Sequence, residues 1–201
     1  MLRWISGFAA VAAHLAGPVA ADELWLTPDL PVARLVLDGR EVVISRMGGE
    51  AGQVCPPHCL QPIRAGQGVV TFGALEVIGF LANEVNSRKG LVLDVRLPAE
   101  FAARRLPGAV NVPLATLSAD NPYRRDILLA LGVREAAGAL DFTDAPRLVV
   151  YGEGPMDDAA ATAVRFLAEA GYPAEMVKYF RGGLTEWQLF GLTLGGIADQ
   201  G

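Results

Sequence analysis

The sequence is short of the side chains on which most catalysis and nucleic-acid binding depend. Its 201 residues include two cysteines and two histidines, and 17 lysines and arginines stand against 22 acidic residues. The net charge of -5 argues against a nucleic-acid partner, because phosphate binding needs clustered basic side chains. Hydrophobic residues make up 52% of the chain, so a sizeable core is available and disorder is not indicated.

Long apolar runs are also scarce, and the one present lies at the N-terminus. Residues 1–21 predict a signal peptide, because Arg3 precedes an alanine-rich apolar stretch and Ala20-Ala21 offers small residues for cleavage. The apolar stretch is short for a bilayer core of ~30 Å; an uncleaved anchor is the alternative. We expect a periplasmic or secreted protein that does not span a membrane after cleavage.

The remaining chain divides into three parts. Residues 22–68 contain a predicted β-hairpin, with its turn at Asp38-Gly39, and then a segment that carries both cysteines. Residues 69–195 alternate apolar runs with helical patterns, and residues 196–201 form a tail. Strands that alternate with helices predict an α/β fold with a parallel sheet covered on both faces. No internal repeat or coiled-coil heptad is present.

Local signals give the expected elements of the main part. Continuous apolar runs at 91–95 and 148–151 are typical of strands buried on both faces. Thr71 is a candidate cap for a helix that reaches about Ser87, and residues 134–146 are predicted to be a loop. Further helices are expected at 98–105, 121–131, 158–170 and 184–190, and short strands at 69–70, 109–112 and 176–180.

The ordered motifs of this part resemble the rhodanese (sulfurtransferase) family. The first half carries Leu93-Asp94-Val95-Arg96, then Glu100-Phe101, then a Pro-Gly-Ala-Val-Asn-Val-Pro run that begins at Pro107. The second half carries Leu148 to Tyr151, a loop, an alanine-rich helix and the run from Arg181 to Trp187. The resemblance implies a sheet of about five parallel strands with helices on both faces. It also implies an active-site loop directly after Tyr151, where open α/β sheets bind ligands.

That loop is degenerate: it reads Gly152-Glu153-Gly154-Pro155-Met156-Asp157-Asp158. In active members its first residue is a cysteine that holds a persulfide, and sulfur transfer needs a thiolate. In one branch the loop reads Cys-x-Gly-Pro-x-Cys, and Gly152 and Asp157 stand at those two cysteine positions. The acidic side chains of this loop would also repel an anionic donor such as thiosulfate. We therefore expect no catalytic residue here and no thiosulfate sulfur transfer.

The other polar residues in the motifs that resemble the family can have structural roles as well as functional ones. Asp157 or Asp158 can cap the following helix, because a negative charge at a helix N-terminus interacts favourably with the helix dipole. The alternative is that these residues form a cation or partner site. Asp94 and Arg96 are expected to form a hydrogen-bonded pair that supports the pocket, because buried charges usually have partners. Trp187 is expected in the core.

The segment Cys55-Pro56-Pro57-His58-Cys59 leaves three interpretations open. A disulfide fits the spacing and an oxidising compartment. A redox-active or sulfur-relay pair could replace the missing loop thiols. A copper or zinc site with Cys55, His58 and Cys59 is the weakest, because His58 lies inside the short loop.

These observations predict an exported, non-catalytic member of the sulfurtransferase family that acts as a binding or scaffold module in sulfur or redox metabolism. The partner is an unidentified protein or a small sulfur species, and no cofactor is implied. The alternative function is a thiol-disulfide or sulfur-relay protein that uses Cys55 and Cys59.

Overall fold

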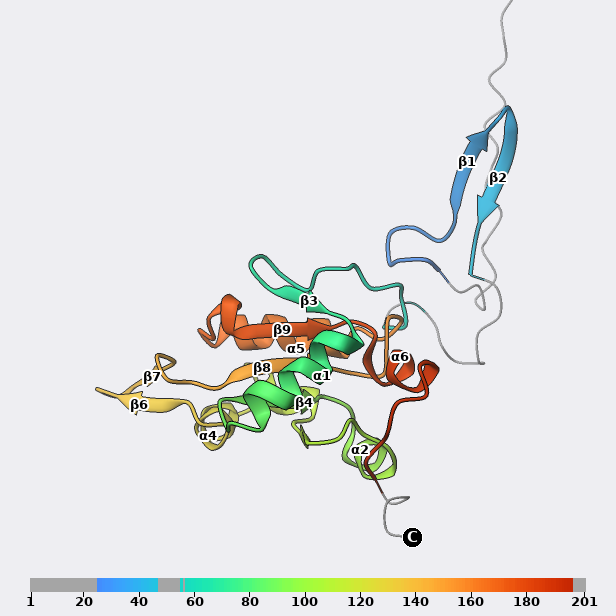
Figure 1. Cartoon of the computed structure of the whole chain (residues 1–201). Helices are drawn as coiled ribbons and strands as arrows, with labels where there is room; N and C mark the ends of the chain where they lie inside the picture. Colours follow the sequence, from blue (N-terminus) through green and yellow to red (C-terminus); the bar gives the residue numbers. More distant parts are fainter. Residues whose placement is uncertain (1–24, 47–54, 56, 197–201) are drawn as a thin grey trace, which may run out of the picture.

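Five parallel strands form the central sheet of the computed structural model, which describes residues 25–46, 55 and 57–196 (Figure 1). The strand order is β3-β9-β8-β4-β5, which confirms the predicted fold class. The predicted signal peptide, residues 47–54 and 56, and the tail beyond Gly196 lie outside the described residues. The strands are β3 (Val70–Phe72), β4 (Gly90–Asp94), β5 (Ala109–Asn111), β8 (Arg147–Tyr151) and β9 (Val177–Phe180).

Helices cover both faces of this sheet. They are α1 (Ala74–Phe80), which continues into a π-helical turn (Leu81–Val85), α2 (Pro98–Ala103), α3 (Leu114–Leu117), α4 (Arg124–Ala130), α5 (Ala159–Glu169) and α6 (Gly183–Leu189), with a 3-10 turn at Ala174–Met176. Within the described residues, no helix combines the length and apolar character needed to cross a bilayer.

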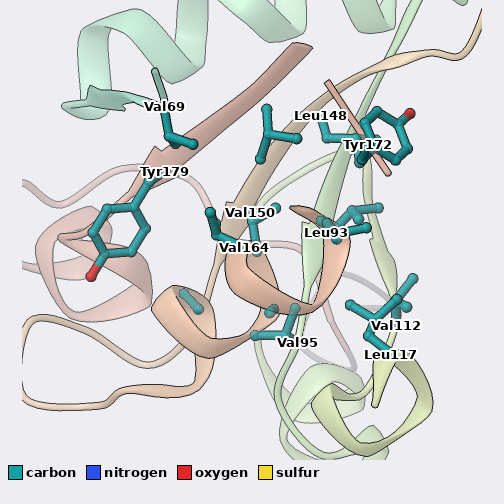
Figure 2. Packing of buried hydrophobic residues seen from close by; sticks show 14 of the residues in the cluster. Val69, Leu93, Val95, Val112, Leu117, Leu148, Val150, Val164, Tyr172 and Tyr179 are labelled. Carbon is teal, nitrogen blue, oxygen red and sulfur yellow. The ribbon is translucent and has the colours of Figure 1, made fainter. Parts of the chain in front are cut away.

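The apolar strands are buried on both sides because alternate residues enter two different cores. On β8, Leu148 and Val150 pack in the cluster that includes α5, and Figure 2 shows Val150 close to Val164. Val149 and Tyr151 point the other way, into the cluster with α1 and α6. That second cluster also holds Trp187, whose indole N–H donates to the carbonyl of Thr193 at 2.8 Å. The continuous apolar run at 148–151 therefore forms a strand that is buried on both faces, as predicted.

Two local predictions were wrong. Thr71 lies within β3, and α1 begins after Gly73, whose N–H donates to the Glu76 carboxylate at 3.0 Å. The supposed loop at 134–146 contains an antiparallel hairpin, β6 (Arg134–Ala136) and β7 (Ala139–Asp141). Its turn places Ala137 and Gly138 at positive φ, and its first strand is exposed, so the sequence had no apolar alternation to indicate a strand.

The predicted N-terminal hairpin is confirmed. β1 (Ala33–Leu37) pairs with β2 (Arg40–Ile44), and Asp38 and Gly39 both have positive φ, as a tight hairpin turn requires. The hairpin projects away from the sheet (Figure 1), so several of its aliphatic side chains are exposed.

Candidate functional site

The candidate site lies at the carboxyl ends of β4, β5 and β8. Asp94 is the last residue of β4, and the register places it opposite Asn111 of β5 and Tyr151 of β8. Gly152 directly follows Tyr151 and begins the loop that leads to α5. Parallel strands thus gather these side chains at one edge of the sheet.

Asp94 and Arg96 form the buried ion pair that was expected. The guanidinium donates through Nε and Nη2 to the two Asp94 carboxylate oxygens at 3.0 and 2.6 Å. Nη1 donates to Glu153 at 3.0 Å, and Nη2 also donates to the carbonyl of Arg104 at 2.6 Å. Burial alone would lower the pKa of Arg96, but the hydrogen bond and charge of Asp94 outweigh it and raise the pKa. Arg96 therefore stays charged, and four of its five N–H groups donate to neighbouring residues.

Tyr151 and Asn111 complete this network and were missed at the sequence level. The Tyr151 hydroxyl donates to Asp94 at 2.5 Å and accepts from the N–H of Leu106 at 3.1 Å. Burial and the negative charge of Asp94 raise the pKa of the phenol. The amide of Asn111 donates to the carbonyls of Asp94 and Arg96. Strand register would have revealed both residues, because each lies opposite Asp94 in the sheet.

Asp157 occupies the space into which a side chain at position 152 would project. A Cβ built on Gly152 would lie 2.6 Å from Oδ2 of Asp157, closer than real Cβ contacts. That oxygen accepts the N–H of Glu153 at 3.0 Å, and Oδ1 accepts the N–H of Ala159 at 3.1 Å. The Asp157 carboxylate therefore accepts one N–H group of the loop and one of the first turn of α5.

Asp157, rather than Asp158, provides the capping contact. Asp158 is at the N-cap position of α5 but makes no side-chain hydrogen bond to the helix. Partial burial and the neighbouring Asp157 charge raise the pKa of Asp158. Ionised Asp158 is consequently less stable here than in the unfolded chain.

The start of α6 holds the loop in place. The N–H groups of Leu184 and Thr185 donate to the carbonyls of Gly152 and Glu153 at 3.1 and 2.8 Å. The two segments approach closely because Gly183 has φ +56, and a Cβ there would lie 2.5 Å from the carbonyl oxygen of Gly152. The start of α6 therefore fixes the backbone of the loop at Gly152 and Glu153.

The cysteine segment packs on the same loop. Cys55 and Cys59 are joined by a disulfide, with their Cα atoms 4.8 Å apart. The N–H of Gln61 donates to the carbonyl of Pro155 at 2.9 Å, and Arg181 at the end of β9 donates to the carbonyl of Gln61 at 2.9 Å. Sequence reasoning placed the cysteines in a separate N-terminal part and could not show that the chain returns to the loop.

Arg46 adds a further link between the N-terminal part and the loop. Its guanidinium donates to the carbonyl of His58 and contacts the sulfur of Met156 at 3.4 Å. The disulfide loop is therefore tied to the degenerate loop through both Gln61 and Arg46.

A cavity of about 760 Å³ opens beside the loop. Loop residues 153–157 line it together with the chain after β4, the start of α3 and Ala159 of α5. His58 joins them from the disulfide loop. A second cavity of about 430 Å³, lined by Lys89, Arg147 and Met176 among others, lies where β4, β8 and β9 begin, away from these groups.

No metal-binding cluster of three or more His, Cys, Asp or Glu side chains occurs among the residues that the structure describes. Both cysteines of the weak metal candidate are bonded to each other, so neither offers a thiolate alongside His58. The residues in place do not fit a metal site.

Comparison with known proteins agrees with this geometry. The family model of the rhodanese-like domain matches residues 79–189, more than half of the 201 residues. The chain belongs to the rhodanese-like domain family. The match runs from the end of α1 to the end of α6 and includes the ion pair and the degenerate loop, so the departures at Gly152 and Asp157 lie inside a family domain.

Two curated proteins contain stretches similar to part of this chain. The chain is 31% identical over 105 residues to the "Adenylyltransferase and sulfurtransferase MOCS3" of Drosophila ananassae, which is 52% of this chain and 20% of that protein. It is 37% identical over 106 residues to the "tRNA 2-selenouridine synthase" of Chromohalobacter salexigens, which is 52% of this chain and 26% of that protein. The matched stretch is a small part of each relative.

Solved structures include the BH2092 protein of Bacillus halodurans. It is 17% identical, with a TM-score of 0.49 over 63% of this chain and 77% of that chain.

Proposed function

We propose that this protein is a non-catalytic rhodanese-like module that binds a partner or a small molecule in sulfur or redox metabolism outside the cytoplasm. One observation carries the proposal: the Asp157 carboxylate fills the space beside Gly152 and accepts the N–H groups of Glu153 and Ala159. Sulfur transfer would require a thiolate at that place. A fixed carboxylate there also disfavours an anionic donor.

Location outside the cytoplasm is supported by two features of the chain. Residues 1–21 have the pattern of a signal peptide, and disulfides persist in oxidising compartments. A fusion of residues 1–30 to a reporter enzyme that works only in the periplasm tests this, with an Arg3→Glu fusion as the control; failure to export the first fusion would contradict the proposal.

A thiosulfate–cyanide assay on the purified protein tests the loss of sulfurtransferase activity. We expect no thiocyanate above the uncatalysed background and no added sulfur in the intact mass after incubation with thiosulfate. Turnover comparable to that of a cysteine-containing rhodanese would overturn the proposal. Variants of both cysteines would then show which sulfur is responsible.

Thiol-disulfide exchange by Cys55 and Cys59 is the second candidate. It is favoured by the packing of the disulfide segment on the loop that lacks a thiol, through the Gln61 contact to Pro155. A partner dithiol would attack one sulfur to form a mixed disulfide and release the other as a thiolate. The second partner thiol would then resolve the mixed disulfide, so the partner leaves oxidised and the pair leaves as two thiols.

Burial of Cys59, which is 3% exposed, weighs against rapid exchange. Equilibration with defined dithiothreitol buffers, followed by alkylation and mass spectrometry, measures the potential of the pair. A potential below about -300 mV is typical of inert structural disulfides and would eliminate this candidate. A potential near that of a cellular thiol pool would support it.

A further inference from the structure

We propose that the cavity beside Gly152 is a binding site for a small organic cation, an ammonium group on an aliphatic body. This inference rests on the proposed function, because a loop without a nucleophile leaves the cavity for binding alone. It names a ligand class opposite in charge to the anionic donors that the family resemblance suggests.

The size and walls of the cavity suit a small apolar molecule. Its volume of about 760 Å³ lies within the range of roughly 300–1,000 Å³ common for small-molecule sites. Apolar groups come from four separate segments: Val95 and Leu97 after β4, Pro113 to Ala115 at the start of α3, Pro155 and Met156 in the loop, and Ala159 in α5. An aliphatic body can therefore be surrounded on several sides.

The charges around these walls are unequal. The carboxylates of Glu100, Glu153 and Asp157 line the cavity against the guanidinium groups of Arg96 and Arg104. Arg96 offers little to a ligand, because it already pairs with Asp94 behind the wall at 2.6 Å and with Glu153 at 3.0 Å. The cavity is thus lined by one more carboxylate than guanidinium groups, and Arg104 is an exposed member of the lining that donates to Gln188 at 3.2 Å.

Asp157 and Glu100 have no cationic partner in the described part of the chain. Asp157 accepts only backbone N–H groups, from Glu153 and Ala159, and Glu100 accepts the N–H of Leu97 at 2.9 Å. Each carboxylate retains unshared acceptor capacity. An ammonium group in the cavity would supply the missing positive charge, and the low local dielectric beside apolar walls would strengthen that attraction.

The electrostatic argument predicts a ranking among ligands of one shape. Hexylammonium, 1-hexanol and hexanoate share their alkyl chain and differ in charge. We expect hexylammonium to bind at least tenfold more tightly than 1-hexanol, and hexanoate to show no saturable binding. Titration of the ¹⁵N-labelled full-length protein, followed by NMR, would place the hexylammonium shifts at Leu97 and residues 153–159.

Matched variants separate a specific carboxylate from general surface charge. Asp157→Asn removes one negative charge in the cavity, and Glu169→Gln removes one on an exposed residue at the far end of α5. We expect Asp157→Asn to weaken hexylammonium binding about fivefold to tenfold and to leave 1-hexanol unchanged, while Glu169→Gln changes neither. If Asp157→Asn loses the dispersed spectrum of a folded protein, Glu100→Gln serves as the second cavity variant.

Three results would overturn the inference: no binding of hexylammonium, equal or tighter binding of hexanoate, or equal effects of the cavity variant and the Glu169→Gln control. Failure of this inference can be distinguished experimentally from failure of the proposed function. Thiocyanate formation in the thiosulfate–cyanide assay would refute the non-catalytic role even with hexylammonium bound. An inactive protein that binds no cation would refute this inference alone.

Discussion

Gly152→Cys should fail to create a persulfide-carrying site, because Asp157 stands where the new side chain must go. The new Cβ would lie 2.6 Å from Oδ2 of Asp157, so the carboxylate must move. Moving it sacrifices the hydrogen bonds from the N–H groups of Glu153 and Ala159. At about 1 kcal/mol for each bond, the substitution should cost about 2 kcal/mol of stability.

The electrostatic cost falls on the thiolate itself. Two negative charges ~4 Å apart at an effective dielectric of ~20 repel by about 4 kcal/mol. Solvent reaches the half-buried Asp157, so we take about half of that repulsion, or ~1.5 pKa units at 1.36 kcal/mol per unit. The introduced thiol should therefore titrate near pH ~10 instead of ~8.5, which leaves little thiolate at neutral pH.

A second substitution should restore the thiolate. In Gly152→Cys/Asp157→Ala the steric conflict and the charge are both gone, and the N–H groups of Glu153 and Ala159 are free to stabilise a thiolate at the start of α5. The thiol pKa should fall below ~8.5. Gly152→Cys/Asp157→Asn keeps the shape and removes the charge, so its thiol pKa should lie between the other two.

Two measurements check this series. The rate of iodoacetamide alkylation against pH gives each thiol pKa, since the Cys55–Cys59 disulfide does not react. Intact mass after incubation with thiosulfate shows whether a sulfur atom has been gained. If the single variant gains sulfur as readily as Gly152→Cys/Asp157→Ala, the reasoning about Asp157 is wrong.

Three further predictions concern buried polar groups. Asp94→Ala should destabilise the protein by about 3–5 kcal/mol, because it leaves the buried Arg96 charge without its main partner; a loss under 1 kcal/mol in urea unfolding would contradict this. Asp158→Asn should stabilise the protein at pH 7, because the folded-state pKa of Asp158 is raised, so the folded carboxyl binds its proton more tightly than the unfolded one. The gain should shrink as the pH falls through that raised pKa to the ordinary value, and a pH-independent gain in thermal unfolding would refute the titration argument. Tyr179→Phe should leave the melting temperature unchanged or raise it, because the buried Tyr179 hydroxyl has no hydrogen-bond partner in the described chain; in Tyr172→Phe, the matched control, loss of the bond to the carbonyl of Pro146 should cost about 1 kcal/mol.

The order of motifs was enough to predict the fold. Apolar runs at β4 and β8 indicated strands buried on both faces, and Asp38-Gly39 indicated the hairpin turn, because both signals are local. The β6–β7 hairpin was not predicted, because its first strand is exposed and its sequence shows no apolar alternation. The start of α1 was predicted wrongly because threonine is a more usual N-cap residue than glycine, which made Thr71 the obvious candidate. In the structure the N-cap is Gly73, and its N–H donates to the side chain of Glu76 inside the helix.

The sequence by itself determined that the loop after β8 has no thiol, since an absent side chain is visible without a structure. Only the tertiary structure decided what replaces it. The Asp157 carboxylate lies in that space, and Gln61, two residues after the disulfide loop, donates to the carbonyl of Pro155 from far away along the chain. Such contacts depend on where folding brings distant backbone atoms together, and neither composition nor periodicity contains that information.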